Sequence, residues 1–265
     1  REVIKKITRA DILDYVATYY QPQNMIIAVT GAYPDRDLDK AVARHWAGRR
    51  AKKFPNWLKV RERQKRPQCK IESKKTEQCH LALGFRSYDH NHRDYIPQIV
   101  LATILGGGMS SRLFTEIRER RGLAYYVRTA TSNYLDTGNF VIQAGIRLGS
   151  LAEALETIYT ELRKMKNEPV SAKELSKAKE YLKGTLTLSL EASEARLAWY
   201  LEQTAFRKKV LEPEGAFARI DKITSRDIAR VARDIFQSRK LSCAIVGQKP
   251  NQATLQRLLK TPNLV

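Results

Sequence analysis

Long apolar runs, an apolar leader and an initiator methionine are all absent from this sequence. No stretch of about 18 apolar residues occurs, which excludes a helix that crosses a membrane. The first ten residues, REVIKKITRA, contain no apolar core of the kind that a secretory signal peptide requires. We therefore expect a soluble chain, cytoplasmic or periplasmic if bacterial, and the compartment stays open.

Cysteine is scarce. The three cysteines are Cys69, Cys79 and Cys243, and none of them forms a C-x-x-C pair. This spacing excludes a zinc ribbon and a thioredoxin-like motif. Cys69 and Cys79 could pair if they lay on adjacent strands, although an unpaired, half-buried thiol is the commoner outcome for cysteine.

Acidic residues are too few to balance the basic ones. The chain has 48 Lys and Arg against 28 Asp and Glu, a net charge of +20, which suggests an anionic partner. Residues 49–66 alone hold nine basic residues and one acid, together with Pro55 and Trp57. We interpret this segment as an extended, solvated linker. Nucleic acid is not expected as a partner, because no nucleic-acid-binding motif accompanies the charge.

An internal repeat is the strongest signal in the chain. Residues 6–31 and 222–247 align without a gap at an offset of 216, and eight of the 26 positions are identical. The identical pairs are Lys6/Lys222, Ile7/Ile223, Thr8/Thr224, Asp11/Asp227, Ile12/Ile228, Gln21/Gln237, Ala28/Ala244 and Gly31/Gly247. Two ungapped copies predict a duplicated domain.

Both copies predict the same local structure. Thr8 and Thr224 are helix N-caps with an acid three positions later, close to a capping box. Apolar residues follow at helical spacing, and then the apolar strands Met25–Val29 and Leu241–Val246, each ended by Gly. A repeat of this length predicts one complete unit here, the last 31 or so residues of an earlier unit, and about 190 further residues upstream.

The predicted boundaries follow from the repeat. Residues 1–48, with a helix over 37–46, form the tail of a truncated first domain; residues 49–66 form the linker; and residues 67–265 form a second domain. The first half of this second domain should contain a core strand over 80–85, a helix over 93–105, a helix over 112–120 capped by Ser110 or Ser111, and a hairpin of 124–134 with 139–146.

The last third of the sequence is predicted to be helical. Residues 151–166 carry an apolar stripe at helical spacing. Ser171 and Glu174 predict a capping box for a helix that runs to about residue 190, and helices near 193–208 and 213–220 precede the repeated tail. Strands followed by helices, with an antiparallel hairpin, indicate an α+β fold: an antiparallel or mixed sheet with helices packed on one face.

Residues 79–146 carry a resemblance to a known family. The stretches CHLALGF and LGGGMSSRLFTEIRERRGLAYYV, and the aromatic-rich hairpin with DTG at its turn, resemble the C-terminal domain of pitrilysin/insulinase-type zinc metallopeptidases, the inverzincins. The resemblance implies two homologous α+β domains that face each other as a clamshell, which agrees with the duplication. This chain would be one half of that clamshell.

The family holds zinc in its first domain with H-x-x-E-H and a later Glu. None of the four histidines here, which are His45, His80, His90 and His92, belongs to such a motif. Since a zinc site needs about three protein ligands and a held water, we expect no metal site and no catalytic residue in this chain. Zinc would belong to the full-length protein or to a partner subunit.

The resemblance does imply a substrate-binding pair. An Arg and a Tyr seven positions later contribute to peptide binding in the family, and Arg118 and Tyr125 meet that spacing. The Arg fork can donate to substrate carbonyls, and the phenol can donate to the oxyanion that develops during peptide-bond hydrolysis. Arg120, Arg121 and Tyr126 are neighbours that could be confused with the pair. Gly106, Gly107 and Gly108 form a hinge or tight turn, and the resemblance places this loop along the chamber.

The leading hypothesis is therefore the substrate-binding domain of a zinc metallopeptidase that degrades or processes peptides in a closed chamber, with the peptide bound as an added β-strand. Its expected partners are the peptide, the missing N-terminal domain, and a related chain in a homo- or heterodimer. Two alternatives remain open: a non-catalytic partner or structural core subunit of the same fold, and a module that binds an anionic polymer.

Overall fold

The computed structural model describes residues 2–46 and 55–247 of the chain. These residues divide into two compact units. The first unit draws on residues 1–59 and 189–205, and the second on residues 60–188 and from 206 onward. Each unit is described by itself below, and no helix of the described ranges is both long and apolar enough to cross a bilayer.

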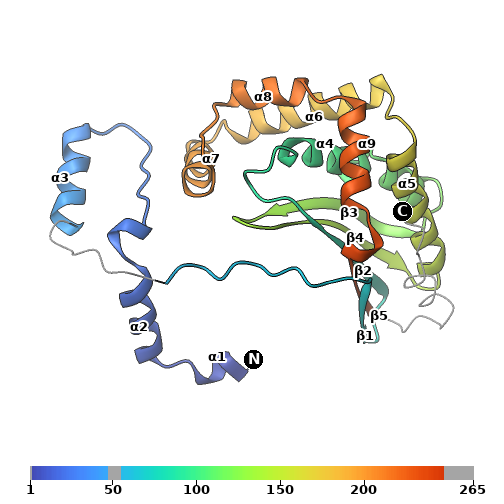
Figure 1. Ribbon diagram of the computed structural model, residues 1–265, viewed down its shortest axis with the longest axis horizontal. Helices are drawn as coiled ribbons and strands as arrows, with labels where there is room; N and C mark the ends of the chain where they lie inside the picture. The colour runs from blue at the N-terminus through green and yellow to red at the C-terminus, as the bar shows by residue number, and fades with distance from the viewer. Residues whose placement is uncertain (1, 47–54, 248–265) are drawn as a thin grey trace. The chain divides into compact units, whose positions relative to one another are not determined.

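A five-stranded mixed sheet forms the centre of the second unit (Figure 1). Its strands are β1 (Gln68–Ser73), β2 (Gln78–Ser87), β3 (Ala124–Asn133), β4 (Gly138–Arg147) and β5 (Leu241–Gly247). They lie in the order β1-β5-β2-β4-β3, with β1 and β5 parallel and the other neighbours antiparallel. The last strand of the sequence thus lies inside the sheet, between the first two.

Helices cover one face of this sheet (Figure 1). The helical segments of the unit are α4 (Tyr95–Gly106), η2 (Phe114–Glu119), α5 (Leu151–Asn167), α6 (Ala172–Ser189), α8 (Pro213–Asp221), α9 (Ser225–Ile235) and the short η3 (Ser238–Lys240). Helix α9 packs against α4, α5 and β2. The α+β fold with a mixed sheet and helices on one face is confirmed.

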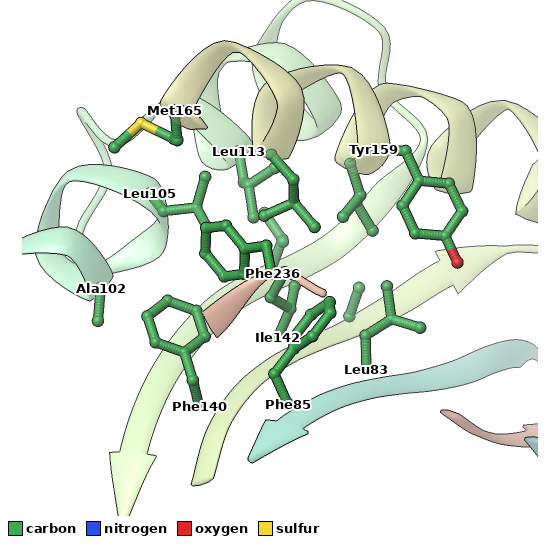
Figure 2. Packing of buried hydrophobic residues seen from close by; sticks show 14 of the residues in the cluster. Leu83, Phe85, Ala102, Leu105, Leu113, Phe140, Ile142, Tyr159, Met165 and Phe236 are labelled. Carbon is green, nitrogen blue, oxygen red and sulfur yellow. The ribbon is translucent and has the colours of Figure 1, made fainter. Parts of the chain in front are cut away.

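Three phenylalanine rings join the helical layer to the sheet (Figure 2). Phe236, which caps α9, meets Phe85 of β2 edge-on at a centroid distance of 5.3 Å and Phe140 of β4 at 5.2 Å. All three side chains are at most 1% exposed. Edge-to-face pairs of this kind add to the free energy gained by burying apolar surface, so Phe236 fixes α9 over the middle of the sheet.

The three cysteines are unpaired thiols, which is the commoner of the two outcomes, and the possible Cys69–Cys79 pair does not form. Cys69 of β1 stands directly beside Cys243 of the parallel strand β5, and not beside Cys79 of β2. All three thiols are free. Burial is the main cause that raises the pKa of the Cys243 thiol, with the Cys69 thiol next to it as a further cause. The Cys243 thiol therefore stays protonated and packs as a small apolar group.

The first unit contains α1 (Glu2–Lys6), α2 (Arg9–Tyr19), η1 (Pro22–Asn24), α3 (Asp35–Trp46) and α7, which runs on to the unit boundary (Ser193–Phe206). The basic segment 49–66 is predicted to be an extended linker. Its residues 55–66 carry no helix or strand, and residues 49–54 lie outside the described residues. The predicted boundaries at 48 and 66 stay predictions.

The two repeated segments fold alike. Helices α2 and α9 begin and end at the same offset of 216, as do η1 and η3. Both helices carry a full capping box: the Thr8 amide donates to Asp11 at 2.8 Å, and the Thr224 amide donates to Asp227 at 3.0 Å. Both segments end in a glycine with positive φ, 130° at Gly31 and 145° at Gly247.

The copies differ in what they pack against. The predicted strand over 241–246 is present as β5, whereas the predicted strand Met25–Val29 is not formed. Strands need a hydrogen-bonding neighbour, and in the described residues none lies beside residues 25–29. Accordingly α9 buries five residues, while α2 buries none and leaves Ile12 56% exposed.

Two predicted helix caps are wrong in part. The Ser171 hydroxyl accepts from the Glu174 amide at 3.2 Å, but the Glu174 carboxylate turns instead to Arg112, with two bonds of 2.7 and 2.8 Å. The Ser111 hydroxyl donates to the Gly108 carbonyl at 2.6 Å and caps no helix. In both cases a tertiary or turn contact outcompetes the local cap that the sequence suggests.

We expect Phe236→Ala to lower the free energy of unfolding by about 3–5 kcal/mol, because it leaves a cavity between α9 and the sheet. The matched control is Tyr20→Ala, the same position of the first copy, where the side chain is 55% exposed. Measured in this chain by itself, that change should cost less than about 0.5 kcal/mol. Urea denaturation followed by circular dichroism measures both, and equal losses would contradict the account of the core.

Candidate functional site

Arg118 and Tyr125 flank the turn that joins η2 to β3. Gly122 makes the turn with φ of 58°, in the left-handed region that favours glycine. The Leu123 amide reaches back to the Ile117 carbonyl at 2.8 Å, and the Leu123 carbonyl accepts from the Arg147 amide at 2.9 Å. The turn is therefore tied to η2 on one side and to the end of β4 on the other.

The predicted helix over 112–120 forms mainly as η2, a single turn of π-helix. Leu113, Ile117 and Leu123 are at most 1% exposed and anchor the segment in the core. The Arg118 side chain is exposed. Isolated π-turns occur frequently at functional sites, and this one presents its basic side chains to solvent while its apolar residues stay fixed.

The three neighbouring arginines of this segment have different partners. Glu116 accepts from Arg120 at 2.5 Å and from Arg121, which also donates to the Glu116 carbonyl at 3.0 Å. Arg118 instead lies with its guanidinium carbon 5.0 Å from the centre of the Phe114 ring. Among the described residues it forms no ion pair. The guanidinium donors of Arg118 thus stay available, whereas those of its neighbours are engaged.

Glu116 is ionised over the whole neutral range. The hydrogen bond from Arg121 is the largest cause and lowers the pKa of this carboxyl. Burial, the next largest, acts in the opposite direction, and the charges of Arg120 and Arg121 lower the pKa further. A lowered pKa means that the contribution to stability is present above the pKa of the unfolded chain and is lost as the pH falls through the folded value. The ion pairs of Glu116 with Arg120 and Arg121 are therefore present at neutral pH.

The two adjacent tyrosines also differ. The register of β3 on β4 shifts between Ala124 and Tyr126, so Tyr125 is the extra residue of a β-bulge. Its side chain is 55% exposed, and no contact of its hydroxyl is seen within the described residues. Bulges commonly redirect a side chain next to a binding site.

Tyr126, by contrast, is held against the sheet. Its hydroxyl lies 3.4 Å from His80 Nδ1, and its ring covers Gly145 so closely that a Cβ at that position would come within 2.5 Å of a ring carbon. The Tyr126 ring therefore packs directly against the backbone of Gly145, where a side chain would leave no room for it. Of the two tyrosines at this turn, Tyr125 is the one with a solvent-facing hydroxyl that has no partner among the described residues.

The glycine run serves close packing. A Cβ at Gly106 would lie 2.7 Å from Thr129 Cγ2, and a Cβ at Gly107 would lie 2.6 Å from Thr103 Cα. Gly108 is looser, with Tyr181 at 3.7 Å. Gly106 therefore lets the end of α4 touch the backbone of β3, where the Thr129 hydroxyl donates to the Ala102 carbonyl at 2.5 Å. A role of Gly106–Gly108 in lining a chamber stays a prediction.

Zinc does not fit the residues that are described. Within residues 2–46 and 55–247, no three or more His, Cys, Asp or Glu side chains come together to form a metal site. His80 faces Tyr126, His90 stacks on Phe206 at 5.4 Å, and His92 stacks on Tyr88 at 4.2 Å. These three imidazole rings thus take part in contacts with aromatic side chains.

Comparison with known proteins decides the family. A family model described as the peptidase M16 inactive domain matches residues 6–182, which is more than half of the chain. The chain belongs to the peptidase M16 family. This assignment confirms the resemblance to pitrilysin/insulinase-type zinc metallopeptidases.

M16 relatives named as zinc proteases cover most of this chain. One from Bacillus subtilis is 34% identical over 201 residues, which is 74% of this chain and 47% of the relative. One from Streptomyces coelicolor is 29% identical over 260 residues, which is 96% of this chain and 56% of the relative. Both are named uncharacterized zinc proteases. The chain thus spans about half the length of the curated relatives it matches.

Solved structures show the same fold. A protease from Helicobacter pylori superposes with a TM-score of 0.84 at 24% identity, over 93% of this chain and 60% of that one. An M16 inactive domain from Pseudomonas fluorescens gives 0.81 at 22%, over 93% and 59%. Complex III of Candida albicans gives 0.78 at 17%, over 93% and 60%. These three likenesses establish the fold of the chain.

Sequence reasoning missed the features that separate the candidate residues from their neighbours. The ion pair of Glu116 with Arg120 could be predicted from the sequence, since the two residues are four positions apart on a predicted helix. The bulge at Tyr125 and the packing of Tyr126 on Gly145 could not, because both depend on the register of β3 against β4.

Gly122→Ala should destabilise the chain by about 1–2 kcal/mol, because an alanine side chain is strained in the left-handed region even where space is open. The matched control is Gly184→Ala in the middle of α6, where no atom lies within 4 Å of the added carbon. That change should instead stabilise by about 0.5–1 kcal/mol. Chemical denaturation of both variants measures the contrast, and a stabilising Gly122→Ala would contradict the strained turn.

Proposed function

We propose that this chain is the substrate-binding half of an M16 zinc metallopeptidase, in which Arg118 and Tyr125 bind the peptide while another domain or subunit supplies the metal. The proposal is supported by a difference in contacts around Gly122. Arg120, Arg121 and Tyr126 contact other side chains through their polar atoms. Arg118 and Tyr125 face solvent with their donors available.

The chemistry of the pair suits a peptide backbone. A guanidinium presents several donors in a rigid fork that can meet carbonyl oxygens. The Phe114 ring beneath Arg118 supports the side chain without occupying its donors. A phenolic hydroxyl can donate to a carbonyl oxygen that gains negative charge during hydrolysis, which is the kind of interaction that lowers a barrier. Bound as an added strand, the peptide would be recognised through its backbone.

Arg118→Ala and Tyr125→Phe should each lower peptide turnover by roughly 10²-fold, the size of effect that follows loss of one oxyanion donor. The assay uses the complete protein, or this chain reconstituted with a zinc-bearing M16 domain, and a quenched fluorescent peptide. Arg120→Ala and Tyr126→Phe are the matched controls and should leave turnover within about twofold.

Unchanged turnover in Arg118→Ala and Tyr125→Phe would remove the pair from the mechanism and favour the structural-subunit alternative. A loss of the same size in the controls would show that the turn matters only as a whole. Unfolding curves of all four variants, measured beside the assay, separate a loss of fold from a loss of function.

The partner follows from the repeat. The positions that α9 buries at Ile228, Val231 and Ile235 correspond to Ile12, Tyr15 and Tyr19 of α2, which are apolar. We propose that α2 packs on the sheet of a preceding homologous domain as α9 packs on its own sheet. A further chain of the same kind could complete a homo- or heterodimer.

Val16→Asp tests this partner. Val16 corresponds to the buried Ala232, so a carboxylate there should destabilise the complete protein by more than about 2 kcal/mol, because burial of an unpaired charge is costly. Ala17→Asp is the matched control, since it corresponds to the exposed Arg233. Thermal denaturation of the complete protein measures both, and equal effects would contradict the docking of α2.

A further inference from the structure

A cavity of about 530 Å³ lies in the second unit, away from the residues of the candidate peptide site. It opens between the start of α4, the end of α8, the start of α9 and the segment that follows α7. None of Arg118, Tyr125 and Gly106–Gly108 lines it. Its volume lies within the range of cavities that hold small molecules, about 300–1,000 Å³.

The lining is strongly basic. Seven Lys and Arg side chains and two Asp side chains line the cavity, together with His90 and His92. Both acids are already engaged. Arg230 donates to Asp94 with bonds of 2.6 and 2.7 Å, and to Asp227 at 3.2 Å. Asp94 is 4% exposed, so this carboxylate is neutralised inside the protein.

The other six cations keep their charge for the cavity. Within the described ranges, Lys208, Lys209, Arg219 and Lys222 form no ion pair, and Arg93 reaches Asp94 only at 3.7 Å with a side chain that is 82% exposed. Arg207 is stacked on an aromatic ring. Six positive side chains around one hollow repel one another. An anion in the hollow would remove that repulsion.

Side-chain contacts hold the residues at the rim of the cavity in place. Asn91 Nδ2 donates to the Phe206 carbonyl at 3.0 Å, and Asn91 Oδ1 accepts from the Lys208 amide at 3.0 Å. The Arg207 guanidinium lies 4.1 Å from the centre of the Tyr95 ring. His90 stacks between the rings of Tyr95 and Phe206. These contacts fix the segment that carries the rim lysines.

The first turn of α4 adds to the positive potential. Tyr95, Ile96 and Pro97 line the cavity, so the N-terminal end of this 12-residue helix faces it. The Asp94 side chain makes no capping bond to this helix, because Arg230 takes it. The Tyr95 amide already donates to the His92 carbonyl at 3.0 Å and Pro97 has no N–H, so this end of the helix contributes its dipole and not a row of free amides.

We propose that this cavity binds a small polyanion that carries two or more phosphate groups. Separate phosphates would contact Lys208 and Lys209 on one wall and Arg219 and Lys222 on the other. The dipole of α4 would favour the negative charge of a phosphate at its N-terminal end. The number of cations exceeds what one phosphate can use. A volume of about 530 Å³ suits a small molecule. The site is independent of the proposed peptidase role.

Sodium triphosphate is the probe, titrated into the whole chain by calorimetry. We expect one site per chain, with binding that weakens as NaCl rises from about 50 to 200 mM, because each phosphate contact releases ions. Orthophosphate should bind at least about tenfold more weakly, since it can engage only some of the cations. No heat of binding with millimolar triphosphate at low salt would overturn the proposal.

Lys209→Ala combined with Lys222→Ala should weaken triphosphate binding at least about tenfold, because two charged contacts with phosphate are lost. Each contact contributes modestly to the binding free energy, since both side chains are exposed. The matched control combines Lys173→Ala with Lys177→Ala, which removes the same charge from exposed positions of α6 outside the cavity. The control should bind as the unaltered chain does. All the altered lysines are exposed, so the fold should persist, and thermal denaturation checks it.

Two results would overturn the assignment. Equal weakening in both double variants would mean that triphosphate responds to the net charge of +20 and to no particular site. Tighter binding of a hexaglutamate peptide than of triphosphate would assign the cavity to an acidic peptide. Comparison of triphosphate with a nucleoside triphosphate then tells whether the phosphates alone are recognised.

Discussion

The second unit depends on the pairing of β5 with both β1 and β2. Strand β5 comes from the end of the described chain and pairs with both strands of the start of the domain, in parallel with β1 and antiparallel with β2. Helix α9 enters the helical layer immediately before β5, and Phe236 joins it to Phe85 and Phe140. The sheet, the core and the helical layer are thus closed by the same short segment. That segment is also the one repeated near the start of the chain.

Much of the fold was readable from the sequence because it rests on local rules. The hairpin of β3 and β4, the stripe of α5 and the capping boxes at Thr8 and Thr224 follow from periodicity and from side-chain chemistry within a few residues. The failures have a common cause. The strand predicted over residues 25–29 has the right pattern but no neighbouring strand in the described part of the chain, and the Glu174 cap is lost to Arg112, which is 62 residues away.

The candidate peptide site could be predicted only in part, for the same reason. The spacing of Arg118 and Tyr125 marked the pair, but five similar side chains lie in the same short stretch. What distinguishes them is tertiary: a carboxylate that takes two arginines, a glycine that seats one tyrosine, and a bulge that turns the other outward. The basic cavity was not predicted at all, because its lysines and arginines come from three separate stretches. Composition showed the charge, and the fold shows where a share of it gathers.

The π-turn of η2 has a consequence for how this surface could change. A π-turn holds one more residue than the α-helical turn that fits the same space. Deletion of a single residue from Phe114–Glu119 would return the segment to ordinary helix with little change in length. Because a π-turn absorbs its extra residue locally, Gly122 and the strand β3 that follow would keep their register on β4. A one-codon loss here would therefore reshape the turn that carries Arg118 and leave the bulge at Tyr125 in place.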